Sequence, residues 1–307
     1  MAFYIHVTST GTGGVWDIND REAVRLGVTN PQEGPGSYFA ATADQSIWEV
    51  IRARTPWFEP PGPTPFHELD LAPGEYYPRI ARPSEHHPSD FPGGSPWARQ
   101  NRDKVAMAQA QLEILTQRLA AICRTVHPEG NNLEAYGHEV RDLLILASTE
   151  VESQWKGVLN ANNYIAPRRH LTALDYSSLA VPMRLAEYAV GFPTYPWLTP
   201  VRPFADWGGG LGGFAKLGWY EAYNAVKHNR EDEFSRGSLN MVFQAVAAVA
   251  VMLVGQFGIE GWKRPQREFF AISEVPEWSL KELYCSPFGR ESTPVDCTLV
   301  PLPLPRH

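Results

Sequence analysis

This 307-residue sequence has few cysteines, no long apolar run and no excess of positive charge. Its three cysteines stand far apart, at positions 123, 285 and 297, and form no C-x-x-C pair, which argues against a secreted disulfide framework. No apolar stretch reaches the roughly 18 residues that a membrane span requires, and residues 1–10 lack a basic leader. We therefore expect a cytoplasmic protein that does not enter a membrane.

The charge balance limits how the chain could bind nucleic acid. Lysine and arginine number 27 against 34 aspartates and glutamates, which gives a formal net charge of −7 at pH 7. An acidic surface does not attract a phosphate backbone along its whole length, so any contact with RNA is expected to be local.

Several common cofactor motifs are also missing. The glycines at 11–14 follow a predicted strand, but no Gly-Lys-Ser/Thr comes after them, so a plain turn is expected there. No G-x-S-x-G nucleophile motif is present. His86 and His87 are adjacent, with only Glu85 and Asp90 near them as further ligands, which is too few for a metal site. We expect neither a cofactor nor a metal.

Proline divides the chain into three predicted parts. Residues 1–94 form an irregular N-terminal region with a short strand at 3–8 and a short helix at 44–54. Eleven of the 27 prolines lie between Pro56 and Pro96, a density that forbids regular helix and disfavours a central strand. The aromatic residues within this stretch indicate that it packs against the rest of the protein. Residues 259–307 are again rich in proline and are expected to be an extended tail.

Between these arms, residues 95–258 show helical periodicity. Apolar residues recur at steps of three and four over 95–127 and 132–160, and a shorter helix is predicted over 176–190, where Pro182 marks a kink or a start. Residues 239–258 are apolar on almost every side, which indicates a helix buried among others. The predicted fold class is therefore all-α, a four- or five-helix antiparallel bundle.

The segment WYEAYNAVKHNR, residues 219–230, concentrates polar side chains beside three aromatic rings. On a helix from Phe214 to Arg230, one face would hold Trp219, Ala222, Tyr223 and Val226, and the opposite face Leu217, Glu221, Asn224 and His228. Asn224 and His228 stand four residues apart, so the amide could orient the imidazole for proton transfer. Lys227 and Arg230 could then stabilise a phosphate, although placement of cations at a helix C-terminus explains them equally well.

The residues YNAVKH, 223–228, resemble the polar motif of the HEPN superfamily, compact all-α domains in which an Arg, a polar residue, three variable residues and a His lie on a late helix. The resemblance covers roughly residues 95–258. Asn224 and His228 match by position, whereas Tyr223 stands where the family has Arg. The resemblance implies metal-independent cleavage of RNA by a homodimer that packs its motif helices together.

Other charged residues are candidates for supporting roles. Glu150 falls beside the apolar stripe of its predicted helix, and a buried carboxylate needs a partner, so Arg230, Lys227 or His228 is expected to face it. Glu152 is interpreted as a solvent-facing charge. Arg168, Arg169 and His170 form a small basic cluster that could contact RNA phosphates or could be a solvated loop.

Two functions remain open. The first is a HEPN-type endoribonuclease from a toxin or phage-defence system, in which His228 acts as acid or base, Asn224 orients it, and Lys227 and Arg230 hold the phosphate. The second is a non-catalytic helical interaction module, or dimerising scaffold, whose polar cluster fixes a homodimer or a regulatory partner protein.

Overall fold

The computed structural model describes residues 2–8, 11–34, 36–54, 65–87, 92–93, 95–208, 216–262 and 268–305. The chain divides into two compact units. The sheet unit comprises Met1–Tyr76, Arg82–Asp90 and Trp278–Val300, and the helical unit comprises Tyr77–Ala81, Phe91–Glu277 and Pro301–His307. The prediction of an all-α bundle is wrong, because the first unit is built on a five-stranded sheet and the chain is mixed α/β.

The sheet unit is antiparallel throughout its main sheet, with strand order β4-β3-β2-β1-β5. The strands span Ala2–Thr8 (β1), Gly11–Ile18 (β2), Glu22–Arg25 (β3), Tyr38–Ala40 (β4) and Phe66–Glu68 (β5). Successive side chains point to opposite faces of a sheet, so Val15 and Trp16 join different cores. One face packs Trp16, Ile18 and Phe39 against helix α1 (Ile47–Arg54). The predicted strand at 3–8 is thereby confirmed, and the helix predicted over 44–54 is present from Ile47 onward.

The other face of the sheet packs against residues from the C-terminal part of the chain. Ile5 and Val15 pack with Trp278, Leu283 and Cys285. Strand β6 (Glu75–Tyr76) pairs in parallel with β9 (Thr298–Leu299), and two short 3-10 turns, η6 (Leu280–Glu282) and η7 (Arg290–Ser292), lie between them in the sequence. Part of the predicted extended tail is therefore integral to the sheet unit.

The helical unit contains the longest elements of the protein. Its helices are α2 (Pro96–Gln100), α3 (Arg102–Thr125), α4 (His138–Ala161), α5 (Ala173–Ser177), α6 (Gly218–His228), α7 (Arg230–Glu233) and α8 (Leu239–Phe257). Short 3-10 turns occur at η1 (Gly130–Glu134), η2 (Leu185–Glu187), η3 (Ala205–Gly208), η4 (Phe234–Arg236) and η5 (Gly258–Gly261). A two-stranded sheet pairs β7 (Ala189–Gly191) with β8 (Ala271–Glu274).

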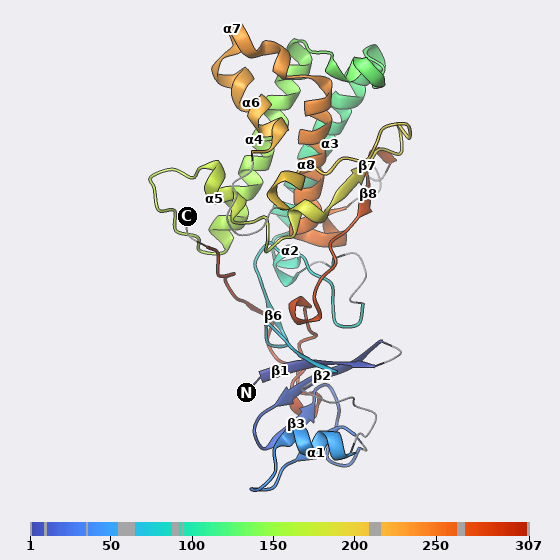
Figure 1. Ribbon diagram of the computed structural model, residues 1–307, viewed down its shortest axis with the longest axis vertical. Helices are drawn as coiled ribbons and strands as arrows, with labels where there is room; N and C mark the ends of the chain where they lie inside the picture. The colour runs from blue at the N-terminus through green and yellow to red at the C-terminus, as the bar shows by residue number, and fades with distance from the viewer. Residues whose placement is uncertain are drawn as a thin grey trace. The chain divides into compact units, whose positions relative to one another are not determined.

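Helix α8 is the centre of this unit, with α3, α4 and α6 packed around it (Figure 1). It is long and apolar enough to cross a membrane by length and composition, but 83% of its most apolar window is buried inside the protein. Burial on nearly every side explains its composition, and the prediction of a buried helix at 239–258 is confirmed.

Two predicted helices differ from the observed ones for local reasons. The first is broken at Asn101, where the side-chain amide donates to the carbonyl of Trp97 and takes the chain out of helical geometry. The helix expected over 176–190 is wrong, because α5 ends at Ser177. The hydroxyls of Ser177 and Ser178 bond back to nearby carbonyls, and Pro182 has no N–H to continue a helix.

Candidate functional site

The motif helix α6 is shorter than predicted. It runs from Gly218 to His228, and the predicted start at Phe214 lies outside the described residues. Asn229 leaves helical geometry, so Arg230 begins the separate helix α7 and does not extend the face that carries His228. The predicted core face is confirmed, since Trp219, Ala222, Tyr223 and Val226 are all buried.

The polar face of α6 is open. His228 is exposed at the last position of the helix, and Asn224, one turn earlier, is half-buried. Among the residues that the structure describes, neither side chain has a hydrogen bond or ion pair. Glu221, on the same face, pairs with Lys216 at 3.4 Å near the surface. The amide and the imidazole therefore share a face but do not hold each other in place.

Tyr223 and Lys227 are engaged with each other. The Lys227 ammonium donates to the Tyr223 hydroxyl at 2.7 Å and lies 4.8 Å from the centre of its ring. The hydrogen bond from Lys227 to Tyr223 raises the pKa of the lysine. Tyr223 thus binds the ammonium of Lys227 through both its hydroxyl and its ring.

A neighbouring carboxylate that the sequence did not indicate completes this cluster. Glu152 of α4 accepts a hydrogen bond of 2.7 Å from the hydroxyl of Tyr220. The indole of the fully buried Trp155 stacks on Tyr176 at 5.0 Å and meets Tyr220 edge-on at 5.6 Å. Burial, reinforced by Glu152, raises the pKa of Tyr176 and of Tyr220, so both hydroxyls stay protonated near neutrality.

This cluster of Glu152, Tyr176, Tyr220, Tyr223 and Lys227 joins α4, α5 and α6. In this cluster Lys227 is paired with Tyr223, and the hydroxyls of Tyr176 and Tyr220 stay protonated near neutrality. Its chemistry favours a structural role. Glu152 was interpreted from the sequence as a solvent-facing charge, and only the contact between helices corrects that interpretation.

Glu150 does not face α6. Its carboxylate accepts a hydrogen bond of 2.8 Å from Gln154, which in turn accepts one of 3.0 Å from Gln256 of α8. Gln256 accepts a hydrogen bond of 2.8 Å from the guanidinium of Arg79, so a relay of four side chains ends at that cation. Burial raises the pKa of Glu150 and lowers the pKa of Arg79 to about 10. The expected partner of Glu150 on residues 227–230 was wrong, and Arg79, 71 positions earlier in the sequence, takes that place.

Arg79 is held with unusual firmness. Its backbone has a φ of +57°, a left-handed conformation that costs free energy for a residue with a side chain. The guanidinium lies 5.3 Å from the ring centre of Trp97 and 5.8 Å from that of Phe257. It also covers Gly157 of α4 so closely that a Cβ there would fall 1.8 Å from a guanidinium nitrogen.

The basic residues Arg168 and Arg169 do not lie on α6. Arg168 and Arg169 are exposed in the segment between α4 and α5. The pKa of the buried Asp175 is lowered because hydrogen bonds from Thr172 and Tyr164, with Arg168 nearby, outweigh the opposing effect of burial. Among the described residues, no three His, Cys, Asp or Glu side chains gather as ligands of a metal would.

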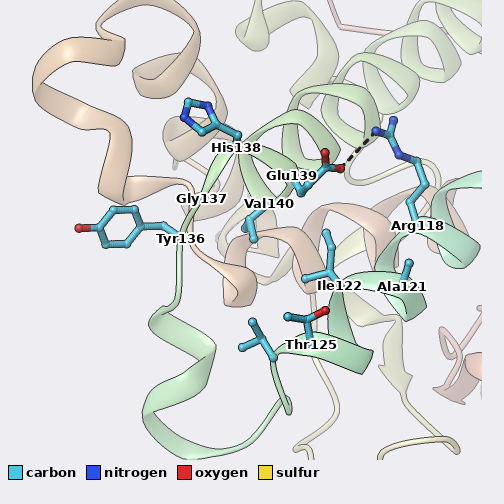
Figure 2. A pocket seen from close by; sticks show the side chains of 10 residues that line it. Arg118, Ala121, Ile122, Thr125, Tyr136, Gly137, His138, Glu139 and Val140 are labelled. Carbon is cyan, nitrogen blue, oxygen red and sulfur yellow. Dashed lines mark ion pairs between the residues drawn. The ribbon is translucent and has the colours of Figure 1, made fainter.

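A hollow in the helical unit lies between the end of α3 and the start of α4, and we call it the α3–α4 groove (Figure 2). It has a volume of about 580 Å³ and is lined by Arg118, Ala121, Ile122, Thr125, Val126 and residues 136–140. Tyr136 and His138 stand at its rim, and Arg118 and Glu139 face each other across it at 3.8 Å. The floor is aliphatic, as in sites that bind apolar side chains.

Comparison of the chain with protein-family models, curated proteins and solved structures gives no match.

Proposed function

We propose that this protein is a non-catalytic interaction module whose helical unit binds a second copy of the chain through the α3–α4 groove. The observation that carries the proposal is the groove itself, an apolar hollow with an aromatic side chain, Tyr136, 56% exposed at its rim. Large side chains exposed around a hollow are typical of surfaces that bind another protein.

The apolar surface extends along α3 beyond the groove. Met107 is 72% exposed and Ile114 is 51% exposed. Together with Ala121 of the groove they recur every seven residues, so they lie along one side of the helix, opposite the buried Leu112, Leu115 and Leu119. A single exposed apolar residue is ordinary, but a stripe that leads into an apolar hollow favours a contact surface.

Charge favours a second copy as the occupant. The C-terminal half of α3 carries Arg118 and Arg124 and no acidic residue, whereas the facing segment, residues 129–139, carries Glu129, Glu134 and Glu139 and no lysine or arginine. In a twofold contact the same patch occurs on both partners, so the basic wall of one copy can meet the acidic wall of the other. The surface is thus complementary to itself.

The test is the mass of the protein in solution. Sedimentation velocity of the full chain should give a dimer, and Ile114→Glu should shift it to a monomer because a carboxylate would be placed within the apolar stripe. Val181→Glu is the matched control, since Val181 is 61% exposed in the same unit and lies outside both the groove and the stripe. A wild-type monomer, or equal loss of dimer in both variants, would contradict the proposal.

A metal-independent endoribonuclease is the second candidate. It is favoured by the exposure of His228 with Asn224 one turn away, which leaves both accessible to a polymer. His228 would act as acid or base with Asn224 beside it, and Arg230 would contact the phosphate with Lys227. Control of that activity by a partner protein belongs to the same proposal.

Its test is cleavage of bulk RNA in the presence of EDTA. Cleavage that is lost in His228→Ala and kept in His67→Ala, an exposed histidine of β5 in the sheet unit, would favour the nuclease. Because His228 is exposed, neither variant should change the melting temperature. Equal cleavage by all three proteins, or none, would exclude it.

A further inference from the structure

A second hollow lies in the sheet unit, and none of its lining residues belongs to the candidate site or to the α3–α4 groove. It has a volume of about 530 Å³, within the range of ~300–1,000 Å³ typical of small-molecule sites. Strand β1, the turn between β2 and β3, and the start of α1 form its walls. The side chains that matter most are those of Tyr4, Asn19, Asp20, Arg21, Gln45 and Trp48.

Two aromatic rings meet in this hollow. Tyr4 and Trp48 have ring centres 5.4 Å apart and planes at 80°. Both are partly buried against the core that contains Phe66, and Trp48 also meets Phe66 edge-on at 5.7 Å. Because packing against the core fixes each ring on one side, the remaining ring surface is a rigid apolar wall of the hollow.

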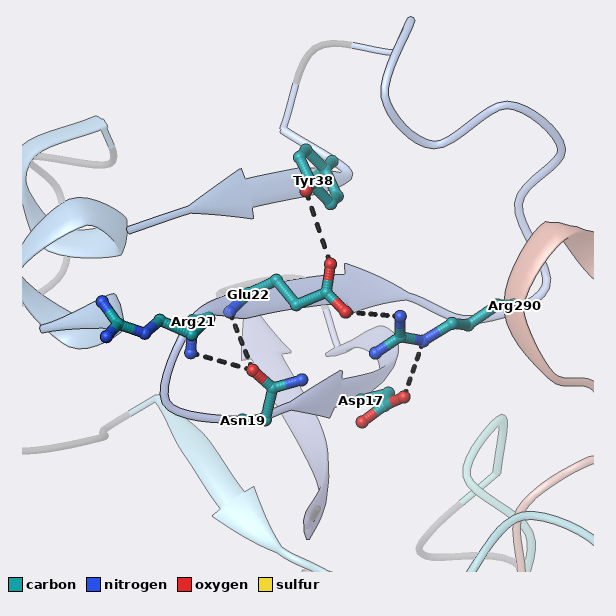
Figure 3. Close-up of polar contacts among 6 residues, drawn as sticks. All are labelled: Asp17, Asn19, Arg21, Glu22, Tyr38 and Arg290. Carbon is teal, nitrogen blue, oxygen red and sulfur yellow. Dashed lines mark hydrogen bonds and ion pairs between the residues drawn. The ribbon is translucent and has the colours of Figure 1, made fainter. Parts of the chain in front are cut away.

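The polar edge of the hollow is fixed in advance (Figure 3). The side-chain Oδ1 of Asn19 accepts hydrogen bonds from the backbone N–H groups of Arg21 and Glu22, at 2.8 and 3.0 Å. Glu22 is itself held by Arg290, which also binds Asp17 at 2.8 Å. The turn that presents Asn19, Asp20 and Arg21 is therefore anchored at both ends, which lowers the entropic cost of binding a ligand.

The opposite edge is also ordered. The Ser46 N–H donates to Glu49 at 2.8 Å, and the Glu49 N–H donates to the Ser46 hydroxyl at 3.2 Å, so a capping box fixes the first turn of α1. The Arg21 guanidinium donates to the carbonyl of Thr42 at 3.2 Å, which ties the two edges together. Gln45 projects from this edge with both an amide donor and a carbonyl acceptor.

The charges around the hollow and in the sheet unit restrict the class of ligand that the hollow could bind. Asp20 and Arg21 give the edge one charge of each sign, so neither an anion nor a cation is matched throughout the hollow. The sheet unit as a whole has seven lysines and arginines against fifteen aspartates and glutamates, so it repels phosphates and carboxylates. The class of ligand that remains is neutral. It has an apolar face that packs against the two rings, and it has hydrogen-bond donors and acceptors that match Asn19, Asp20, Arg21 and Gln45.

We propose that this hollow binds a neutral carbohydrate. A pyranose ring has a face of C–H groups that packs against an aromatic side chain, and each of its hydroxyls both donates and accepts a hydrogen bond. Trp48 and Tyr4 supply the apolar contact, and Asn19, Asp20, Arg21 and Gln45 bind the hydroxyls. This assignment is independent of the dimer proposed for the helical unit.

The experiment is isothermal titration of the full chain with four neutral tetrasaccharides, built from glucose, xylose, mannose or N-acetylglucosamine. At least one should bind with a dissociation constant of about 1 mM or lower, equivalent to at least ~4 kcal/mol. Trp48→Ala and Gln45→Ala should each weaken binding about tenfold or more. Gln45 is exposed, so its variant removes a ligand contact without touching the core.

Trp197→Ala is the matched control, because Trp197 is 48% exposed in the helical unit and should leave binding unchanged. The proposal is overturned if no tetrasaccharide binds at about 10 mM, or if binding survives both Trp48→Ala and Gln45→Ala. Tighter binding of a sulfated or phosphorylated sugar than of its neutral counterpart would also overturn it.

Discussion

Replacement of Gly157 by alanine should destabilise the protein, although the same change in a helix normally stabilises it. Gly157 lies inside α4, where alanine is preferred to glycine by about 1 kcal/mol. A Cβ built there would fall 1.8 Å from one guanidinium nitrogen of Arg79 and 2.5 Å from its central carbon. The guanidinium must therefore move.

The cost of that movement follows from what holds Arg79. A free arginine would swing aside cheaply, but this one donates to Gln256 at 2.8 Å and lies against the rings of Trp97 and Phe257. With a pKa of about 10 it is still charged at pH 7. Loss of the charged hydrogen bond costs ~1.5–3 kcal/mol, and loss of the cation–π contacts ~0.5–2 kcal/mol. Against the helical gain, Gly157→Ala should lower the free energy of unfolding by about 1–4 kcal/mol.

The assay is urea unfolding followed by far-ultraviolet circular dichroism. Gly218→Ala is the control, because Gly218 is also helical and has nothing within 4 Å of an added Cβ. In an Arg79→Gly background the obstruction is gone, so Gly157→Ala should become neutral or stabilising, and this reversal measures the coupling between the two residues. Stabilisation by Gly157→Ala in the wild-type background would refute the account of Arg79.

Three further predictions concern charged groups. The hydrogen bond from Arg290 lowers the pKa of Glu22, so its stabilising contribution is present above about pH 4.3, the ordinary glutamate value, and is lost as the pH falls through the lowered pKa. Glu22→Gln should thus destabilise at pH 7 and flatten the stability loss in acid, measured by urea unfolding against pH; an unchanged profile would contradict this. Burial raises the pKa of Glu150, so the protonated form is favoured on folding and stability falls as the pH rises through that pKa. Glu150→Gln should stabilise at pH 8 and have no effect near pH 4 in the same assay, and destabilisation at pH 8 would refute the direction of the shift. Lys227→Met should cost less than about 1 kcal/mol, because the ammonium that binds Tyr223 is exposed, and a larger loss would show that the pair is a main support of α6.

The sequence predicts the helical elements better than the sheet. Helices α3 and α4 each follow apolar periodicity over 24 residues, and α8 is apolar on almost every side over 19 residues; both signals are strong enough to survive local exceptions. Strands β3, β4 and β5 are three or four residues long, and β5 follows a proline-rich stretch, so no alternation could develop. The sheet also takes its second core from Trp278, Leu283 and Cys285, which no local pattern could indicate.

In the candidate site, too, some features could be predicted from the sequence and others could not. The burial of Tyr223 and the placement of Asn224 and His228 on one face follow from helical geometry alone. The partner of Glu150 does not, because Arg79 lies in an irregular segment and reaches the carboxylate through two glutamines on different helices. Spacing within a helix was informative, whereas contacts between distant segments required the folded chain.

Self-association through the α3–α4 groove is tested most directly by exchanging charge between its walls. Arg124→Glu and Glu134→Arg each place like charges against each other in a twofold dimer, so each variant alone should sediment as a monomer. Mixed in equal amounts, the two variants restore opposite charges at both contacts and should sediment as a dimer. Dimers of either variant alone, or a mixture that remains monomeric, would contradict the account.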